Sequence, residues 1–208
     1  MSQYVTLTFL IGLLSQALFS ARLIVQWIAS ERARRIESPR IFWQLSLLAS
    51  LLFCLYGWMR NDFAILLGQL VTYYIYIWNL KMKGAWRDIH PIMRVFIAGL
   101  PCVACGWFLL HWQTTFEHLF KQENLPALLI LFGSCSQLLF TLRFVYQWWY
   151  SSQHEASLLP VTFWCISLTG SLLIVIYAIL RRDPVLILGQ SCGFVVYARN
   201  IMIGLRHK

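Results

Sequence analysis

The chain has 208 residues, of which 59% are hydrophobic and 12% are charged, and its formal net charge is +9. Soluble domains carry about 25% charged residues, so this composition excludes an ordinary soluble domain. No hydrophilic stretch is long enough for a separate soluble catalytic domain, which excludes most cytosolic enzyme folds. The composition therefore predicts an all-α membrane protein.

Seven apolar stretches follow one another along the chain, each close to the roughly 20 residues that a helix needs to cross a bilayer. We expect each to form a transmembrane helix. The first is too long for a cleavable signal peptide and has no positive charge before it. The expected spans are residues 4–29, 41–59, 62–81, 92–112, 126–150, 161–180 and 184–204.

The chain also repeats itself: residues 12–83 align without a gap with residues 133–204, at a constant offset of 121 positions. About 25 of the roughly 72 aligned pairs are identical, including charged and amide residues that apolar composition alone would not match. We therefore predict two parallel three-helix repeats and one linker helix, a 3+1+3 plan. The expected parts are a first repeat at 1–83, a linker with the fourth helix at 84–125 and a second repeat at 126–208.

Basic residues gather in loops that would share one side of the membrane. By the positive-inside rule, this asymmetry places the N-terminus outside and the C-terminus in the cytoplasm. The net charge then reflects topology and gives little support to a nucleic-acid partner. The expected cytoplasmic positions are Arg32, Arg34, Arg35, Arg40, Lys81, Lys83, Arg87, Arg94, Arg206 and Lys208.

Arginines lie inside the expected spans. Arg22 and Arg143 occupy equivalent positions in the two repeats, and Arg199 lies near the cytoplasmic end of the last span. Charged groups within spans are costly and usually face a cavity or a partner, yet all 8 acidic residues lie in loops or at span boundaries. Two interpretations stay open. Either the arginines extend toward cytoplasmic headgroups, or a ligand supplies the missing negative charge, and phosphate suits their forked donors.

Amide and tryptophan side chains recur at equivalent positions of the two repeats. We expect the amides to face the repeat interface, because an unpaired amide in hydrocarbon is costly. There they either bond between helices or contact a sugar. With the arginines, the candidate substrate-binding residues are Arg22, Gln26, Trp43, Gln69, Asn79, Arg143, Gln147, Trp164, Gln190, Arg199 and Asn200.

Patterns typical of catalysis or metal binding are not found. The spans contain no paired acids and no nucleophile–base spacing, and the chain has no nucleotide-binding loop. The 5 histidines form no ligand spacing on a helix, and Cys102 and Cys105 have C-x-x-C spacing but lie in an apolar run without a neighbouring acid or a second cysteine pair. We therefore predict no catalytic residues, no metal and no cofactor, and a protein that is not an enzyme.

Two motif sets stand out in the second repeat. One is Gln147-Trp148-x-x-Ser151 with Phe163-Trp164 after Pro160. The other runs from Arg181-Arg182-Asp183-Pro184-Val185 through Ile187-Leu188-Gly189-Gln190 to Arg199-Asn200. Together they resemble the lipid A biosynthesis N-terminal domain family, which in turn resembles the SWEET, semiSWEET and PQ-loop transporters. The resemblance covers nearly all of the chain outside residues 84–125 and implies a SWEET-like 3+1+3 fold.

The family also resembles components encoded near polyprenyl-phosphate glycosyltransferases of bacterial envelope pathways, which implies a lipid-linked sugar as cargo. We predict a transporter, or flippase, that moves a polyprenyl-phosphate-linked sugar across the bacterial inner membrane for envelope glycan or lipid A modification. The alternatives are a transporter of a small soluble sugar or polar solute, and a non-transporting scaffold for envelope glycosyltransferases. The expected partners are the lipid-linked sugar phosphate, membrane lipids and those glycosyltransferases, and no nucleic acid.

Overall fold

The computed structural model describes residues 2–59, 63–110, 127–181 and 184–206, and these residues form seven α-helices. The helices closely follow the seven predicted stretches, so the prediction of an all-α protein is confirmed. The predicted short links at 60–62 and 182–183 lie outside the described residues. The helices are α1 (Ser2–Ala33), α2 (Arg40–Met59), α3 (Phe63–Met82), α4 (Pro91–Leu110), α6 (Ala127–Gln153), α7 (Val161–Arg181) and α8 (Pro184–Leu205).

The outside of the bundle is apolar and much of its inside is polar. Leu14, Val95 and Leu180 are among many exposed large hydrophobic side chains, whereas serines, amides and two arginines are buried. Such an arrangement is expected where lipid surrounds the protein. Within the described residues, three helical segments are long and apolar enough to cross a membrane: Leu7–Ala33, Arg40–Met59 and Val161–Leu180. The chain is therefore an all-helical, membrane-associated protein.

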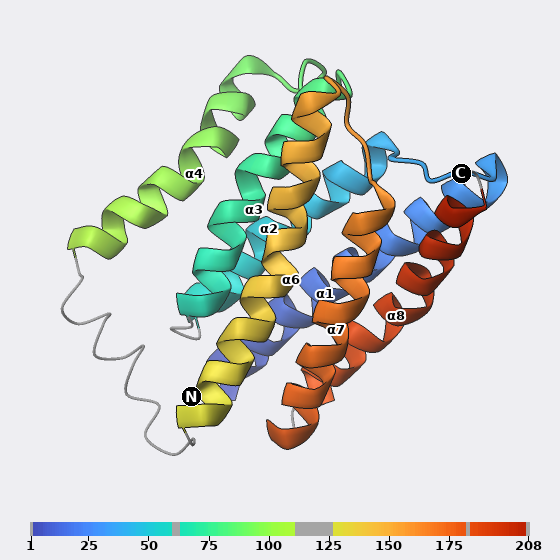
Figure 1. Ribbon diagram of the computed structural model, residues 1–208. Coiled ribbons are helices and arrows are strands. Elements are labelled where there is room, and N and C mark those ends of the chain that lie inside the picture. Colours follow the sequence, from blue (N-terminus) through green and yellow to red (C-terminus); the bar gives the residue numbers. More distant parts are fainter. Residues whose placement is uncertain (1, 60–62, 111–126, 182–183, 207–208) are drawn as a thin grey trace.

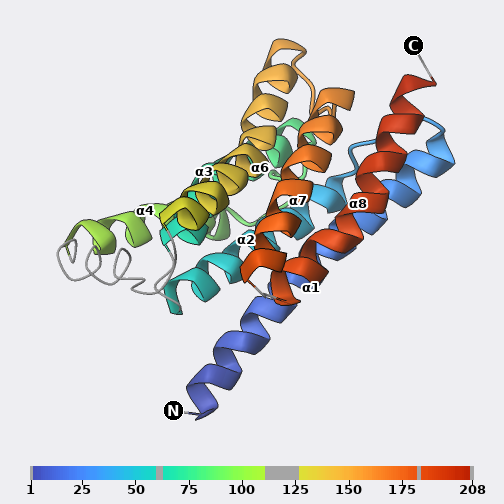
Figure 2. The same cartoon turned by 60° about the horizontal axis from the view of Figure 1, so that its bottom comes forward.

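Six of the seven described helices pack as two groups of three (Figure 1). In the first group α2 contacts both α1 and α3, and in the second α7 contacts both α6 and α8. The groups meet along two seams, where α1 lies against α8 and α3 lies against α6. Figure 2 shows that α1 begins and α8 ends at opposite ends of the bundle.

The fourth predicted helix, α4, lies at the edge of the bundle beside α3 (Figure 1). Pro101 inside α4 has no N–H to donate to the carbonyl of Ile97, one turn earlier. The hydroxyl of Tyr73 in α3 donates to that carbonyl at 2.8 Å, and the hydroxyl of Tyr74 donates to the next carbonyl, of Ala98, at 3.1 Å. These tyrosines attach α4 to α3 at the position that proline weakens.

Aromatic side chains fill the bundle where α2 and α7 begin. Trp43 and Trp164 are fully buried. Each meets the preceding phenylalanine edge-on, with ring centroids 4.7 Å apart for Phe42–Trp43 and 4.9 Å for Phe163–Trp164. Both helices start directly after a proline, a residue well suited to the first turn because its fixed φ is already helical. The repeat therefore builds the same aromatic layer twice.

Candidate functional site

Two pairs of amide side chains join the groups, one pair at each seam. Gln26 in α1 donates to Asn200 Oδ1 in α8 at 2.9 Å, and Asn200 donates back to Gln26 Oε1 at 3.0 Å. Gln147 in α6 and Asn79 in α3 exchange the same two bonds, at 3.0 and 3.1 Å. All four residues are fully buried. The prediction that these amides face the repeat interface is confirmed.

Each glutamine of these pairs also holds the loop that follows its own helix. Gln26 Nε2 contacts Ser30 Oγ at 2.8 Å and the carbonyl of Glu37 at 3.1 Å. Gln147 Nε2 contacts Ser151 Oγ and the carbonyl of Leu158, both at 2.8 Å. The amide pairs therefore connect the helices across each seam and also hold the two equivalent loops that follow α1 and α6.

A cavity of about 90 Å³ lies between the groups, lined by α1, α2, α3, α6 and α8. About 10–15 Å³ of such space suffices for one water, so the cavity has room for several waters or for a compact polar group. Its walls are both aromatic and polar. The polar lining residues are Gln16, Ser20, Arg22, Gln69, Thr72, Tyr76, Gln137, Thr141, Arg143, Gln190 and Tyr197.

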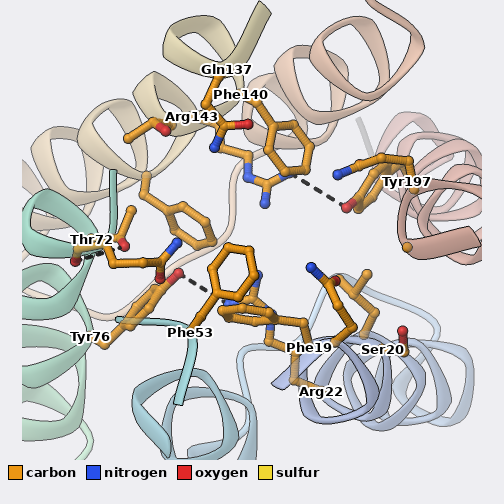
Figure 3. A pocket seen from close by; sticks show the side chains of 17 residues that line it. Phe19, Ser20, Arg22, Phe53, Thr72, Tyr76, Gln137, Phe140, Arg143 and Tyr197 are labelled. Atoms are coloured by element: carbon orange, nitrogen blue, oxygen red, sulfur yellow. Dashed lines mark hydrogen bonds between the residues drawn. The ribbon is translucent and has the colours of Figure 1, made fainter. Parts of the chain in front are cut away.

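Two arginines extend into this cavity from opposite sides, Arg22 from α1 and Arg143 from α6 (Figure 3). Each is only 4% exposed. Arg22 Nη1 donates to Ser46 Oγ at 2.8 Å and to the Tyr76 hydroxyl at 3.2 Å. Arg143 Nη1 donates to the Tyr197 hydroxyl at 3.5 Å. In the part of the chain that the structure describes, neither Nε atom has a hydrogen-bond partner.

Aromatic rings surround both guanidinium groups. Arg143 Cζ lies 3.3 Å from the ring centroid of Phe140, and Arg22 Cζ lies 4.6 Å from that of Phe19. The ring of Phe144 is shared: its centroid is 4.8 Å from Arg143 Cζ and 5.3 Å from Arg22 Cζ, which limits the separation of the two Cζ atoms to about 10 Å. Cation–π contacts contribute about 0.5–2 kcal/mol, but they supply no countercharge.

No carboxylate is present among the described lining residues, so two buried cations face one cavity without an acid. Buried charges are costly unless they are paired, and like charges repel more strongly when water is scarce. Both arginines line the cavity. An anion held between them would remove both penalties.

The predicted binding residues separate into two sets. Arg22, Gln69, Arg143 and Gln190 line the cavity. The other predicted binding residues do not line this cavity in the described structure. They are the amide pairs Gln26–Asn200 and Asn79–Gln147, the core residues Trp43 and Trp164, and Arg199.

Arg199 has an acidic partner. Its guanidinium forms a two-point salt bridge with Glu31, with Nη2 3.1 Å from Oε2 and a second bond from Nε to Oε1. Trp27 Nε1 also donates to Glu31, at 3.0 Å. The bridge crosses the α1–α8 seam and is about one-third exposed. Arg199 therefore helps to join the repeats, whereas Arg22 and Arg143 have no acid beside them in the described lining.

Some lining residues were not among the predicted binding residues. Gln16 and Gln137 are identical at equivalent repeat positions and precede a lining phenylalanine by three residues, a signal that could have identified them. Phe144 carries no such signal, because the equivalent residue is Leu23. Within the described ranges, no three His, Cys, Asp or Glu side chains gather as metal ligands would.

Comparison with known proteins identifies relatives. The model of the lipid A biosynthesis N-terminal domain matches residues 11–81 and 132–202. The chain is similar to the lipid-A-disaccharide synthases of Chlamydia caviae (26% identity, 93% of this chain), Chlamydia pneumoniae (27%, 97%) and Chlamydia trachomatis (27%, 94%). It spans only 32–34% of the length of these relatives. No solved structure matches it.

These relatives are enzymes, and they correct the predicted function. The predicted transporter of a polyprenyl-phosphate-linked sugar is contradicted, as are its two alternatives, the soluble-solute transporter and the non-transporting scaffold. The prediction of a protein that is not an enzyme is contradicted as well. It rested on the absence of a catalytic pattern within the spans. Relatives about three times as long can hold such a pattern outside the matched part.

The predicted family, in contrast, is confirmed. The two matched segments together cover more than half of the chain and coincide with the two copies of the internal repeat. The chain belongs to the lipid A biosynthesis N-terminal domain family.

Proposed function

We propose that this chain is a membrane-embedded module of lipid-A-disaccharide synthesis, and that the cavity between its repeats binds the phosphate of a glycolipid. The link to disaccharide synthesis rests on the enzymes that the chain resembles. The observation that carries the binding part is the pair Arg22 and Arg143, both buried in a lining that contains no described carboxylate.

Phosphate is the anion that fits this lining best. A guanidinium group offers parallel N–H donors that match two oxygens of a phosphate, and both arginines have an Nε without a partner among the described residues. The hydroxyls of Tyr76 and Tyr197 lie beside the guanidinium groups. Two cations would balance a phosphate that carries close to two negative charges.

The rest of the ligand follows from the surroundings of the cavity. Amides such as Gln69 and Gln190 can exchange hydrogen bonds with sugar hydroxyls, since an amide both donates and accepts. The lipid chain would stay in the surrounding bilayer. A polyprenyl-phosphate-linked sugar carries its phosphate as a diester with one negative charge, whereas an acylated sugar phosphate carries a monoester with close to two. The binding experiment below separates them.

The membrane arrangement is part of the proposal. Seven helices would cross the bacterial inner membrane in a SWEET-like 3+1+3 plan, with a first repeat at 1–83, a linker at 84–125 and a second repeat at 126–208. The N-terminus would be periplasmic and the C-terminus cytoplasmic, as the distribution of basic loops favours. The start of α1 and the end of α8 lie at opposite ends of the bundle, which supports an odd number of membrane crossings (Figure 2). Membrane lipids and an envelope glycosyltransferase are the proposed partners.

Binding to the purified protein tests the proposal. The chain is placed in lipid nanodiscs and titrated with three ligands: an acylated sugar phosphate, the same acylated sugar without its phosphate, and a polyprenyl-phosphate-linked sugar. We expect saturable binding of one or both phosphorylated ligands, with affinity at least about tenfold above that of the dephosphorylated one. The doubly substituted variant Arg22→Gln, Arg143→Gln should lose this preference. Equal binding of the phosphorylated and dephosphorylated lipids would contradict the proposal.

A further inference from the structure

We infer that the two halves of the cavity are not equivalent, and that the glycolipid phosphate binds against the Arg143 half. This inference rests on the proposed function and deepens it. The sequence repeat would place two equal arginines around one ligand. The hydrogen bonds in the structure distinguish them.

In the first half of the cavity, the polar side chains already form hydrogen bonds with one another. Arg22 Nη1 has two hydroxyl partners, Ser46 at 2.8 Å and Tyr76 at 3.2 Å. On the same side, Ser50 donates to Gln69 Oε1 at 2.9 Å. These bonds hold Arg22 and Gln69 in place and use part of their capacity.

The second half engages the equivalent groups less. The bond from Arg143 to Tyr197 is 3.5 Å long, well beyond the usual 2.7–3.2 Å range. Ser171, the counterpart of Ser50, is fully buried, and its hydroxyl has no partner among the described residues. Gln190, the counterpart of Gln69, lines the cavity. A buried polar group without a partner costs about 1–3 kcal/mol, so this half gains more from a polar ligand.

Contact with an aromatic ring explains how Arg143 stays in place with only this one long hydrogen bond among the described residues. Its Cζ lies only 3.3 Å from the ring centroid of Phe140, against 4.6 Å for Arg22 and Phe19. Contact with this ring helps to hold the guanidinium group without using its N–H donors. Those donors are the ones that grip two phosphate oxygens. Arg143 is thus held ready for an anion, while Arg22 supplies a second positive charge nearby.

Matched single variants test this difference. The protein in nanodiscs is titrated with dioctanoyl phosphatidic acid, a lipid with a phosphate monoester, and with dioctanoylglycerol as the uncharged control. Lysine keeps the positive charge but lacks the paired N–H donors of a guanidinium group. Arg143→Lys should therefore weaken phosphatidic acid binding about tenfold, whereas Arg22→Lys should weaken it less than about threefold. Arg143→Gln and Arg22→Gln, checked by gel filtration, repeat the comparison without the charge.

A third variant tests the cause of the difference. Ser46→Ala removes the shortest bond of Arg22, so in the Arg143→Lys background it should recover part of the lost affinity. Equal losses for Arg22→Lys and Arg143→Lys would overturn the inference and leave the proposed function standing. A larger loss for Arg22→Lys would also overturn it. No loss in either variant, together with equal binding of the uncharged control, would overturn the proposed function as well.

Discussion

At the scale of single residues, the two repeats share side chains but not their partners. Trp43 Nε1 donates to Ser38 Oγ at 2.9 Å. At the position equivalent to Ser38 the second repeat has Leu159, and the buried Nε1 of Trp164 has no partner among the described residues. Identical tryptophans therefore carry one satisfied and one unsatisfied donor.

This difference predicts unequal effects of one substitution. Trp43→Phe removes a bonded donor and leaves Ser38 Oγ with Ser157 as its one remaining partner among the described residues, so it should cost about 1 kcal/mol more than Trp164→Phe. Both changes remove the same volume from a fully buried site, so each serves as the control for the other. The measurement is the free energy of unfolding in mixed detergent micelles. A larger cost for Trp164→Phe would contradict the assignment.

How far single residues could be predicted depends on the range of their contacts. Arg22 and Arg143 could be placed in a cavity because a buried charge repeated at an equivalent position needs a common reason. Arg199 could not, because its partner Glu31 lies 168 positions away and only the fold brings them together. Phe144 was missed because it breaks the repeat and has Leu23 as its counterpart.

At the scale of helices, the seams depend on reciprocal amide bonds. Gln26 and Asn200 each donate to and accept from the other across the α1–α8 seam. Apolar periodicity and the repeat together predicted the helix ranges and the position of these amides at the repeat interface. They could not predict that these amides would bind each other instead of a ligand, because both outcomes require the same buried position.

A double-mutant cycle checks the seam. Gln26→Leu removes the donor to Asn200 Oδ1 and to the Glu37 carbonyl, so it should cost about 1–3 kcal/mol, and Asn200→Leu should cost a similar amount. The double variant should cost less than the sum, because two apolar groups then face each other. Unfolding in mixed micelles measures all three. Strict additivity of the two single effects would contradict a direct amide pair.

The attachment of α4 gives a second prediction at this scale. Tyr73→Phe removes the donor to the Ile97 carbonyl that Pro101 leaves without an N–H. Hydrogen exchange in α4 should therefore become faster by about threefold to tenfold, since a lost net bond is worth about 0.5–1.5 kcal/mol. In a Pro101→Ala background the helix regains its own N–H, so Tyr73→Phe should matter less. An equal effect in both backgrounds would exclude the proposed role of the tyrosine.

At the scale of the whole molecule, the fold was easier to predict than the function. Bilayer thickness limits the lengths of the helices, and a gapless repeat limits how the helices group. Composition and periodicity therefore sufficed to predict most of the helical arrangement. The prediction of a transporter failed for a different reason. It assumed that the membrane helices carry out the whole function by themselves. The relatives, however, are synthases, and the chain matches only 32–34% of their length.

By the proposed function, the cavity between the repeats holds the phosphate of a glycolipid. The most direct measurement is photolabelling of the protein in nanodiscs by an acylated sugar phosphate that carries a diazirine on the sugar, followed by peptide mass spectrometry. We expect labels on lining segments of both repeats, near Arg22 in α1 and near Arg143 in α6. Excess unlabelled phosphorylated lipid should suppress them, and the dephosphorylated lipid should not. Labels confined to the outer, lipid-facing surface, or equal suppression by both competitors, would contradict the claim.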